Sequence, residues 1–313
     1  MNISNLIELL NAKLIQEGSI LSIGGFALSL DEVKPSYAFF CNDKNKTKEA
    51  IQKGAYAIIY EKDIKIIDKE LYYLKVQDLE NALFRLFRFL CEEKECKFLL
   101  CSKRELNFCK VFFLKTLYGN IFLDFNSLIK AKKGDFFCFN EKEYLLKIAT
   151  HYETLENIKL TKFENSTPFY SSFICDDLYF KKLNLPFLYI EIFSQFVNFC
   201  KKNQLKIHFN LNNLDLFKIY FVNEAMQIVE FGTSTRAFIV LENEEEMEFW
   251  QEKFKDFNGF KTALKNSLFC DFSYNEIKDL KKFKDFTYCA VLANINDFEN
   301  AFKISDTNTP SLF

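Results

Sequence analysis

The stretch that most constrains the fold of this chain is EAIQKGAYAIIYEK, residues 49–62. Its first half has the pattern of a helix, a glycine follows, and an unbroken apolar run typical of a buried strand comes next. The chain has only eight glycines, so Gly54 is expected to have a specific structural role. Glycine adopts the left-handed backbone conformation at low cost, which lets a helix end and the chain turn directly into a parallel strand. This unit predicts an α/β fold.

The same alternation of helix and strand patterns continues along the chain. An opening helix is expected over 3–14, with Ser4 as its N-cap and Gly18 as its stop, and a long amphipathic helix is expected to begin after Asp78. Further helices are predicted over 45–53, 140–157, 187–203 and 244–257. Strands are predicted at 37–41, 55–60, 71–76, 97–101, 134–139, 216–222, 226–232, 236–242, 260–265 and 288–293, with a β-rich segment at 167–186. We divide the chain into three domains, 1–95, 96–214 and 215–313. The last of them is expected to end in a loose tail that begins at about residue 305.

Composition excludes several classes of function. The formal net charge is −2 and lysines are interspersed with acidic residues, so neither a nucleic-acid footprint nor a polybasic membrane patch is expected. The first residues lack the pattern of a signal peptide, and no uncharged run is long enough to cross a membrane. The ten cysteines stand in apolar contexts. We therefore expect a cytoplasmic protein with reduced, mostly buried thiols.

Few residues suggest catalysis or metal binding. Cys91, Cys96, Cys101 and Cys109 do not have the spacing of zinc ligands, so buried thiols are expected and no metal site is predicted. His151 is expected on a helix surface, with a metal role beside Glu153 and Glu156 as the less favoured alternative, and His208 on a strand. No catalytic set can be assembled from the spacing of these residues.

The most pointed local feature is FGTSTRAFIV, residues 231–240. Backbone N–H groups, hydroxyls and a guanidinium in one turn are suited to hold an anion. The alternative is an ordinary hairpin turn whose arginine makes a surface ion pair, and it is the more common arrangement. The candidate anion site consists of Gly232, Thr233, Ser234, Thr235 and Arg236.

Three segments in the first 90 residues resemble the N-terminal domain of the Mur ligases, the ATP-dependent enzymes that add amino acids to UDP-N-acetylmuramoyl peptides. They are SLDEVKPSYAFF (29–40), AIQKGAYAIIYEK (50–62) and VQDLENAL (76–83). The resemblance implies an α/β N-terminal domain followed by further α/β regions. The matching positions, mostly packing and turn residues, are Val33, Pro35, Phe39, Ala50, Ile51, Lys53, Gly54, Ala55, Val76, Asp78, Ala82 and Leu83.

The departures from the family pattern concern its chemistry. The Asp-Ser-Arg phrase that helps hold the uridine nucleotide in the family is Ser29-Leu30-Asp31 here, and only NDKNKT stands where an Asp-Gly-His/Arg segment is expected. The family's Gly-x-x-Gly-Lys-Thr phosphate loop should follow the first strand of the central domain, where this chain reads KFLLCSKRELNF. No glycine occurs between Gly54 and Gly119, so a phosphate-wrapping loop is not expected there.

These observations predict a catalytically inactive Mur-ligase-like protein that serves as a binding or scaffold partner in cytoplasmic peptidoglycan assembly. It is expected to use no cofactor and to bind protein partners, with a UDP-sugar precursor as a further candidate ligand. Two alternatives stay open. One is a small-ligand-binding protein or transferase that uses the turn at 232–236. The other is a pure protein–protein interaction module, with exposed Phe residues and the terminal Ser-Leu-Phe as its contacts.

Overall fold

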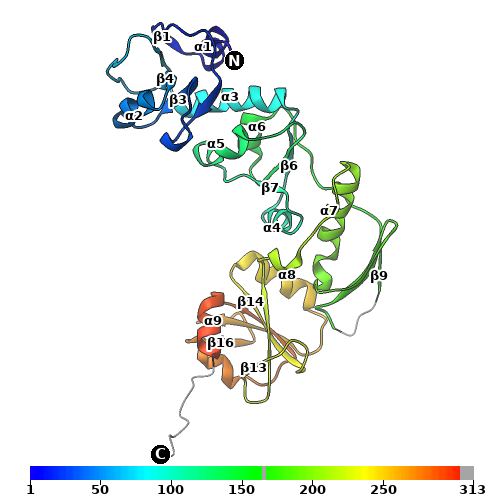
Figure 1. Cartoon of the computed structure of the whole chain (residues 1–313). Coiled ribbons are helices and arrows are strands. Elements are labelled where there is room, and N and C mark those ends of the chain that lie inside the picture. The colour runs from blue at the N-terminus through cyan, green and yellow to red at the C-terminus, as the bar shows by residue number, and fades with distance from the viewer. Residues whose placement is uncertain (164–166, 304–313) are drawn as a thin grey trace, which may run out of the picture. The chain divides into compact units, whose positions relative to one another are not determined.

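The computed structural model describes residues 1–163 and 167–303, and this part of the chain forms two compact units that divide between Glu156 and Asn157 (Figure 1). Each unit has its own sheets and its own core. The fold is mixed α/β with parallel sheets, as predicted. The domain boundaries predicted near residues 95 and 214 stay predictions, and the tail from residue 305 lies outside the described residues.

The first unit opens with a five-stranded sheet in the order β1-β5-β4-β3-β2. β2 to β5 are parallel to their neighbours, and β1 is antiparallel to β5. The strands predicted at 37–41 and 55–60 are confirmed without change. The elements are α1 (Ile3–Leu10), β1 (Lys13–Gln16), β2 (Gly25–Ala27), η1 (Leu30–Glu32), β3 (Tyr37–Cys41), η2 (Lys44–Lys46), α2 (Thr47–Gln52), β4 (Ala55–Tyr60), β5 (Tyr72–Lys75) and α3 (Leu79–Glu93).

Gly54 makes the predicted turn between α2 and β4. Its φ is +95°, and a Cβ atom at this position would lie 3.0 Å from the Cα of Pro35. Its carbonyl accepts a hydrogen bond from the backbone N–H of Ser36 at 3.1 Å. The glycine is therefore required both for its backbone conformation and for its close approach to the segment that leads into β3.

The helix ends differ in how well the sequence predicted them. Asp78 caps α3 as predicted, because its carboxylate accepts from the backbone N–H groups of Glu80 and Asn81. The predicted ends of the first helix are wrong. Asn2, not Ser4, is the N-cap of α1, and the helix stops at Asn11 in the left-handed conformation, well before Gly18. Asparagine tolerates this conformation better than most residues, so it can end a helix in place of glycine.

The first unit continues with a small parallel sheet in the order β6-β8-β7. No clear turn is apparent in the sequence before Gly119, yet α4 ends at Val111, and Phe113 turns the chain with φ +56°. The helix predicted over 140–157 is shorter than expected. The elements are β6 (Lys97–Leu100), α4 (Lys103–Val111), β7 (Lys115–Thr116), α5 (Ile121–Ile129), β8 (Phe136–Phe139) and α6 (Lys142–Ile148).

A single hydrophobic core joins the two sheets of the first unit. It includes Leu83 and Phe87 of α3, Phe40 of the five-stranded sheet and Phe137 of the small sheet. Phe125 of α5 makes edge-to-face contacts with Phe40 and Phe87, with ring centroids 6.2 and 5.5 Å apart. Helix α3 thus buries apolar side chains against both parts of the unit.

The second unit contains an antiparallel sheet, β11-β10-β9, and a six-stranded sheet, β13-β12-β14-β17-β15-β16. The strand predicted at 260–265 is confirmed without change, whereas β16 and α9 were not predicted. The elements are β9 (Leu160–Phe163), β10 (Ser171–Cys175), β11 (Leu178–Leu183), η3 (Phe187–Tyr189), α7 (Ile190–Lys202), η4 (Leu211–Asn213), β12 (Lys218–Val222), β13 (Ile228–Val229), β14 (Arg236–Leu241), α8 (Glu244–Phe254), β15 (Phe260–Lys265), β16 (Phe272–Tyr274), η5 (Ile277–Lys282), β17 (Tyr288–Leu292) and α9 (Ile295–Phe302).

A buried polar chain connects η3 to α8 in the second unit. The hydroxyl of Tyr189 donates to the carboxylate of Glu246 at 2.7 Å and accepts from the indole N–H of Trp250 at 3.0 Å. All three side chains are buried. Because each has a hydrogen-bond partner, this polar group costs little to bury and ties the segment before α7 to the six-stranded sheet.

None of the helices in the described residues is long and apolar enough to span a membrane.

We predict that Gly54→Ala destabilises the first unit more than Gly134→Ala does. Both glycines have positive φ, but a Cβ at Gly134 would meet nothing within 4 Å. Gly134→Ala should cost about 1 kcal/mol for the left-handed conformation alone, and Gly54→Ala about 1–2 kcal/mol more because Pro35 must move. Urea unfolding followed by far-UV circular dichroism measures both.

The single tryptophan, Trp250, serves as an internal control because it lies in the second unit. Its fluorescence transition should stay unchanged in the Gly54→Ala variant. Equal costs for the two substitutions would contradict the role assigned to the contact with Pro35.

Candidate functional site

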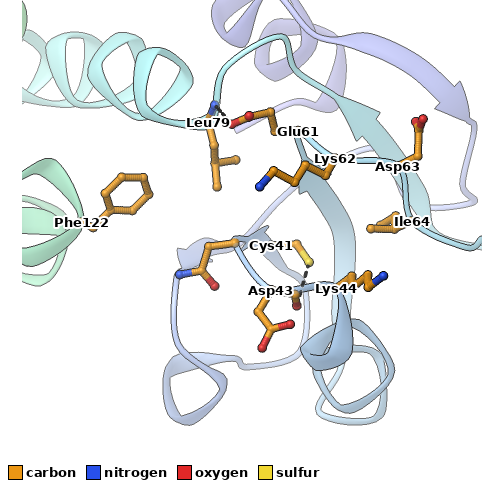
Figure 2. Close-up of a pocket in the computed structure, with 10 residues that line it drawn as sticks. Cys41, Asp43, Lys44, Glu61, Lys62, Asp63, Ile64, Leu79 and Phe122 are labelled. Atoms are coloured by element: carbon orange, nitrogen blue, oxygen red, sulfur yellow. Dashed lines mark hydrogen bonds between the residues drawn. The ribbon is translucent and has the colours of Figure 1, made fainter.

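A cavity of about 440 Å³ opens at the carboxyl ends of β3 and β4 (Figure 2). In open parallel sheets, ligands bind outside the carboxyl ends of the strands, and this volume is within the range of small-molecule sites. The end of β3, the end of β4, the start of α3 and one residue of α5 form its wall. The lining residues are Cys41, Asn42, Asp43, Lys44, Glu61, Lys62, Asp63, Ile64, Leu79 and Phe122.

The charges around this cavity do not favour the binding of an anion. Three carboxylates and two ammonium groups line it. The carboxylate of Glu61 accepts from the backbone N–H of Leu79 at 3.2 Å, so an acidic side chain already occupies the N-terminus of α3. Asp63 pairs with Lys75 at 2.5 Å, while the ammonium of Lys62 points toward Leu79 and the interior of the cavity in Figure 2. A phosphate group here would face Glu61, which opposes binding.

Cys41 lies in the wall of the cavity, and its thiol is not activated. The sulfur donates to the carbonyl of Asp43 at 3.3 Å and lies 3.3 Å from the hydroxyl oxygen of Thr47. Burial raises the pKa of the Cys41 thiol above its ordinary value. The thiol therefore stays protonated at neutral pH and is a poor nucleophile.

The turn at 29–32 lies just beyond β2 and is closed by its own carboxylate. Glu32 accepts from the backbone N–H groups of Leu28 at 3.3 Å and Ser29 at 3.2 Å. Burial acts to raise the pKa of Glu32, but these hydrogen bonds and one from Asn126 outweigh it, and the pKa is lowered. Where the resemblance implies a phrase that holds a uridine nucleotide, the donors of this turn are used within the chain.

The junction between β6 and α4 is where the resemblance implies a phosphate loop. Only Cys101 and Ser102 join the strand to the helix. The hydroxyl of Ser102 accepts from the backbone N–H of Glu105 at 3.2 Å, and the Glu105 carboxylate accepts from the N–H of Ser102 at 2.5 Å. This reciprocal capping box satisfies backbone donors that a phosphate would otherwise use.

Four residues of the predicted anion site, Gly232 to Thr235, lie in the turn between β13 and β14, and Arg236 is the first residue of β14. The Thr233 hydroxyl donates to the carbonyl of Glu230 at 2.7 Å, and the Ser234 hydroxyl donates to the carbonyl of Val222 at 2.6 Å. Gly232 has φ +77°. The Arg236 guanidinium has no hydrogen-bond or ion-pair partner among residues 1–163 and 167–303. These contacts organise the turn, and anion binding by Gly232–Arg236 stays a prediction.

The two histidines are far from a catalytic arrangement. His151 is exposed, with its Nδ1 atom 3.1 Å from the Thr150 hydroxyl. It lines a cavity of about 320 Å³ that also includes Cys91 and Cys96. The strand predicted around His208 is wrong, because this exposed residue lies in the irregular segment that follows α7.

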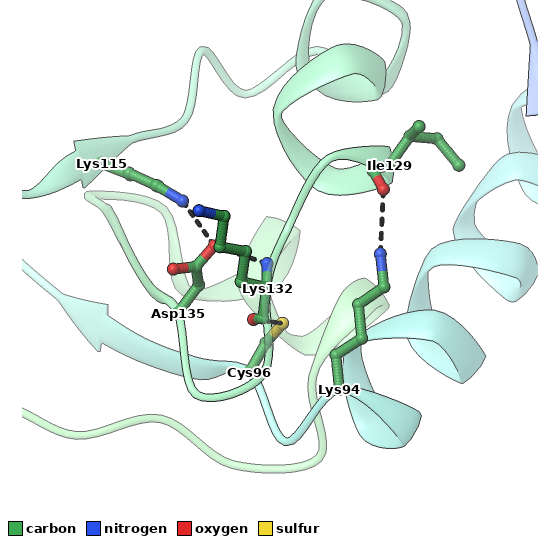
Figure 3. A network of polar contacts seen from close by, with 6 residues as sticks. All are labelled: Lys94, Cys96, Lys115, Ile129, Lys132 and Asp135. Atoms are coloured by element: carbon green, nitrogen blue, oxygen red, sulfur yellow. Dashed lines mark hydrogen bonds and ion pairs between the residues drawn. The ribbon is translucent and has the colours of Figure 1, made fainter.

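A polar network holds the amino-terminal edge of the small sheet (Figure 3). The Asp135 carboxylate pairs with the ammonium of Lys115 and accepts from the backbone N–H of Lys132 at 2.7 Å. Lys94 donates to the carbonyl of Ile129 at 2.9 Å. Burial acts to raise the pKa of Asp135, but its hydrogen bonds with Lys115 and Lys132 prevail and lower it. The network connects β7 and β8 and is structural.

This lowered pKa predicts a contribution to stability that depends on pH. The contribution is complete above the pKa of an unfolded aspartate, about 3.9, and is lost as the pH falls through the lower pKa of folded Asp135. Asp135→Asn should therefore cost about 0.5–1 kcal/mol at pH 7, a modest amount because Lys115 is half exposed. The cost should shrink toward pH 3 in urea unfolding at a series of pH values.

Asp63→Asn is the matched control, since its ion pair with Lys75 is on the surface and the Asp63 side chain is 87% exposed. We expect little change for this variant. A cost for Asp135→Asn that did not vary with pH would contradict the electrostatic explanation.

Comparison with solved structures shows a Mur ligase fold. The chain is similar to the MurF ligase from Thermotoga maritima, solved in complex with ADP, with a TM-score of 0.52 at 11% identity over 89% of this chain and 96% of that chain. MurF from Acinetobacter baumannii also matches, with a TM-score of 0.48 at 11% identity over 96% of this chain and 86% of that chain. A UDP-N-acetylmuramoyl-L-alanyl-D-glutamate–2,6-diaminopimelate ligase also matches, with a TM-score of 0.46 at 9% identity over 94% of this chain and 93% of that chain.

The first of these matches confirms the resemblance to Mur ligases and extends it from the first 90 residues to most of the chain. At 11% identity the likeness shows the fold alone. No model of a known protein family matches the sequence, and no curated protein sequence matches it either.

Proposed function

We propose that this chain is a non-catalytic protein with the Mur ligase fold, acting as a binding or scaffold partner in the cytoplasmic stage of peptidoglycan assembly. The junction between β6 and α4 carries the proposal. A phosphate loop needs several free backbone N–H groups in a glycine-rich turn. Here two residues form the junction, and Ser102 and Glu105 cap each other across it. Glu105 also places a carboxylate where a nucleotide would bring negative charge.

The retained packing residues support a role that keeps the fold. Asp78 and Gly54 hold the ends of α3 and α2, and Val33, Phe39 and Leu83 are buried. The chain thus preserves the residues that shape the first unit, while the turns expected to bind nucleotide are closed by its own acidic side chains. This combination favours binding over ATP-driven ligation.

The proposal predicts a specific pattern of ligand stabilisation. Mg-ATP should neither raise the melting temperature of the purified protein nor be hydrolysed. A ligand present at about 100 times its Kd adds roughly 2.7 kcal/mol of stability, which thermal unfolding detects. The same thermal unfolding is measured with UDP-N-acetylmuramoyl tripeptide and with UDP alone. Stabilisation by the UDP-sugar would identify the precursor as the bound species, and measurable ATP turnover would exclude the proposal.

The turn at Gly232–Arg236 supplies a second candidate function, a small-anion site of a ligand-binding protein or transferase. Its support is the Arg236 guanidinium, which lacks an ion-pair partner in the described part of the chain.

If UDP stabilises the protein, Arg236→Ala should abolish the stabilisation by UDP without lowering the melting temperature of the free protein. Lys181→Ala, which removes an exposed cation from β11, is the control. Full UDP stabilisation of Arg236→Ala would exclude the turn as the site.

The contact with a protein partner is expected at Leu268 and Phe269 in the second unit. These adjacent side chains follow β15 and are 93% and 92% exposed. Two large apolar side chains exposed side by side mark an interaction surface more often than isolated ones do. The terminal Ser-Leu-Phe, also considered for this role, lies outside the described residues.

We predict that replacing Leu268 and Phe269 together by serine reduces co-purification of peptidoglycan-assembly proteins from the native cell by about tenfold, as expected when about 1.4 kcal/mol of binding energy is lost. Quantitative mass spectrometry after mild cross-linking measures it. Because neither side chain packs in the core, the melting temperature should not change. Leu21→Ser, at a site 71% exposed in the first unit, is the control. Unchanged recovery with the double variant would contradict this assignment.

A further inference from the structure

Three cysteine side chains meet beside the small sheet of the first unit. Cys138 lies on β8, the middle strand, Cys101 directly follows β6, and Cys109 lies on α4. Their three Sγ atoms are within 4.8 Å of one another, and those of Cys101 and Cys109 are 3.7 Å apart. The expectation of no metal site rested on Cys91, Cys96, Cys101 and Cys109. The structure groups only two of these residues and adds Cys138.

The register of the sheet explains this grouping. Leu99 of β6 is directly opposite Cys138 of β8, and the N–H of Cys101 donates to the carbonyl of Phe139 at 2.9 Å. Residues two apart on a strand face the same side of a sheet, so Cys101 and Cys138 share a face. Helix α4 packs against β8 and brings Cys109 to the same place. Cys101 is 4% exposed, and the other two cysteines are fully buried.

We propose that Cys101, Cys109 and Cys138 form a binding site for Cu(I), held by their three sulfur atoms. An ion about 2.3 Å from each of three sulfurs in a plane places those sulfurs about 4 Å apart. The Cys101 and Cys109 sulfurs are 3.7 Å apart, close to this value, and the other two separations are at most 4.8 Å. The site can therefore close around an ion with only small side-chain adjustments, and the inference does not rest on the proposed function.

The donor set selects a soft monovalent ion. Thiolates prefer Cu(I), zinc and iron–sulfur clusters over hard cations. Structural zinc is almost always held by four ligands, but in the described residues no fourth histidine, cysteine, aspartate or glutamate joins the group. Residues close to these cysteines in the chain are apolar and fully buried, among them Leu99, Phe108 and Val111. Such surroundings disfavour a water molecule as the fourth ligand, so a three-coordinate ion fits best.

Thiolate sulfur, not the neutral thiol, is the metal ligand. Binding of Cu(I) replaces thiol protons, which pass to solvent, and the oxidation state of copper does not change. The positive ion offsets one of the negative charges that the buried sulfurs then carry.

The test is an anaerobic titration of the reduced, full-length protein with Cu(I) against the coloured competitor bicinchoninate. Wild-type protein should withdraw one equivalent of Cu(I), and X-ray absorption should show copper bound to three sulfurs. Cys138→Ser and Cys109→Ser should each lose this uptake. Cys289→Ser, a fully buried cysteine of the second unit, should retain it. Far-UV circular dichroism of each variant reports whether it is folded.

Several results would overturn the proposal. Wild-type protein that leaves all Cu(I) with the competitor would do so without reliance on any variant. Equal loss of uptake in Cys289→Ser and Cys138→Ser would show scattered thiol binding. Tighter uptake of Zn²⁺ than of Cu(I) in a parallel titration would overturn the assignment of the ion. A Cys101–Cys109 disulfide on mild oxidation, together with no copper uptake, would assign the cluster to redox chemistry.

Discussion

The burial of helix α3 is the interaction on which the first unit depends. Asp78 fixes where the helix begins, and its apolar residues then face both the five-stranded sheet and the helices of the small sheet. Phe87 contacts Phe125, which in turn contacts Phe40. Burial of large side chains is the main stabilising term in folding. The segment up to residue 156 therefore forms one compact unit, whose two sheets share the core around α3.

This arrangement separates the fold from the chemistry usually associated with it. A parallel sheet offers a ligand site at the carboxyl ends of its strands, and the cavity beside Cys41 occupies that place. Yet Glu32, Glu61 and Glu105 each accept hydrogen bonds from backbone N–H groups at turns or helix starts where an anionic ligand would seek donors. A carboxylate from the chain itself satisfies these groups and repels a phosphate. The same β6–α4 junction brings Cys101 beside Cys109 and Cys138, so it offers soft sulfur ligands and no phosphate loop.

Much of the fold could be predicted from the sequence, and the misses have definite causes. The strands around Gly54 and the helix after Asp78 were predicted because their signals lie within a few residues of the element. The end of α1 was missed because asparagine took the place of the expected glycine, and the end of α4 because Phe113 turned the chain without one. The turn predicted to bind an anion does form. Its Thr233 and Ser234 hydroxyls, however, donate to the carbonyls of Glu230 and Val222, and Val222 is distant in the sequence.

The sequence by itself determined the α/β class, the turn at Gly54 and the lack of a phosphate loop, because each depends on the conformation that neighbouring residues allow. A junction without glycine rarely turns several backbone N–H groups toward one phosphate, because glycine is the residue that adopts the required conformations at low cost. Only the tertiary structure decided which cysteines meet and which carboxylates close the turns. Those contacts join residues far apart in the chain, and they depend on the register of β6 and β8 and on the packing of α4, which no local pattern encodes.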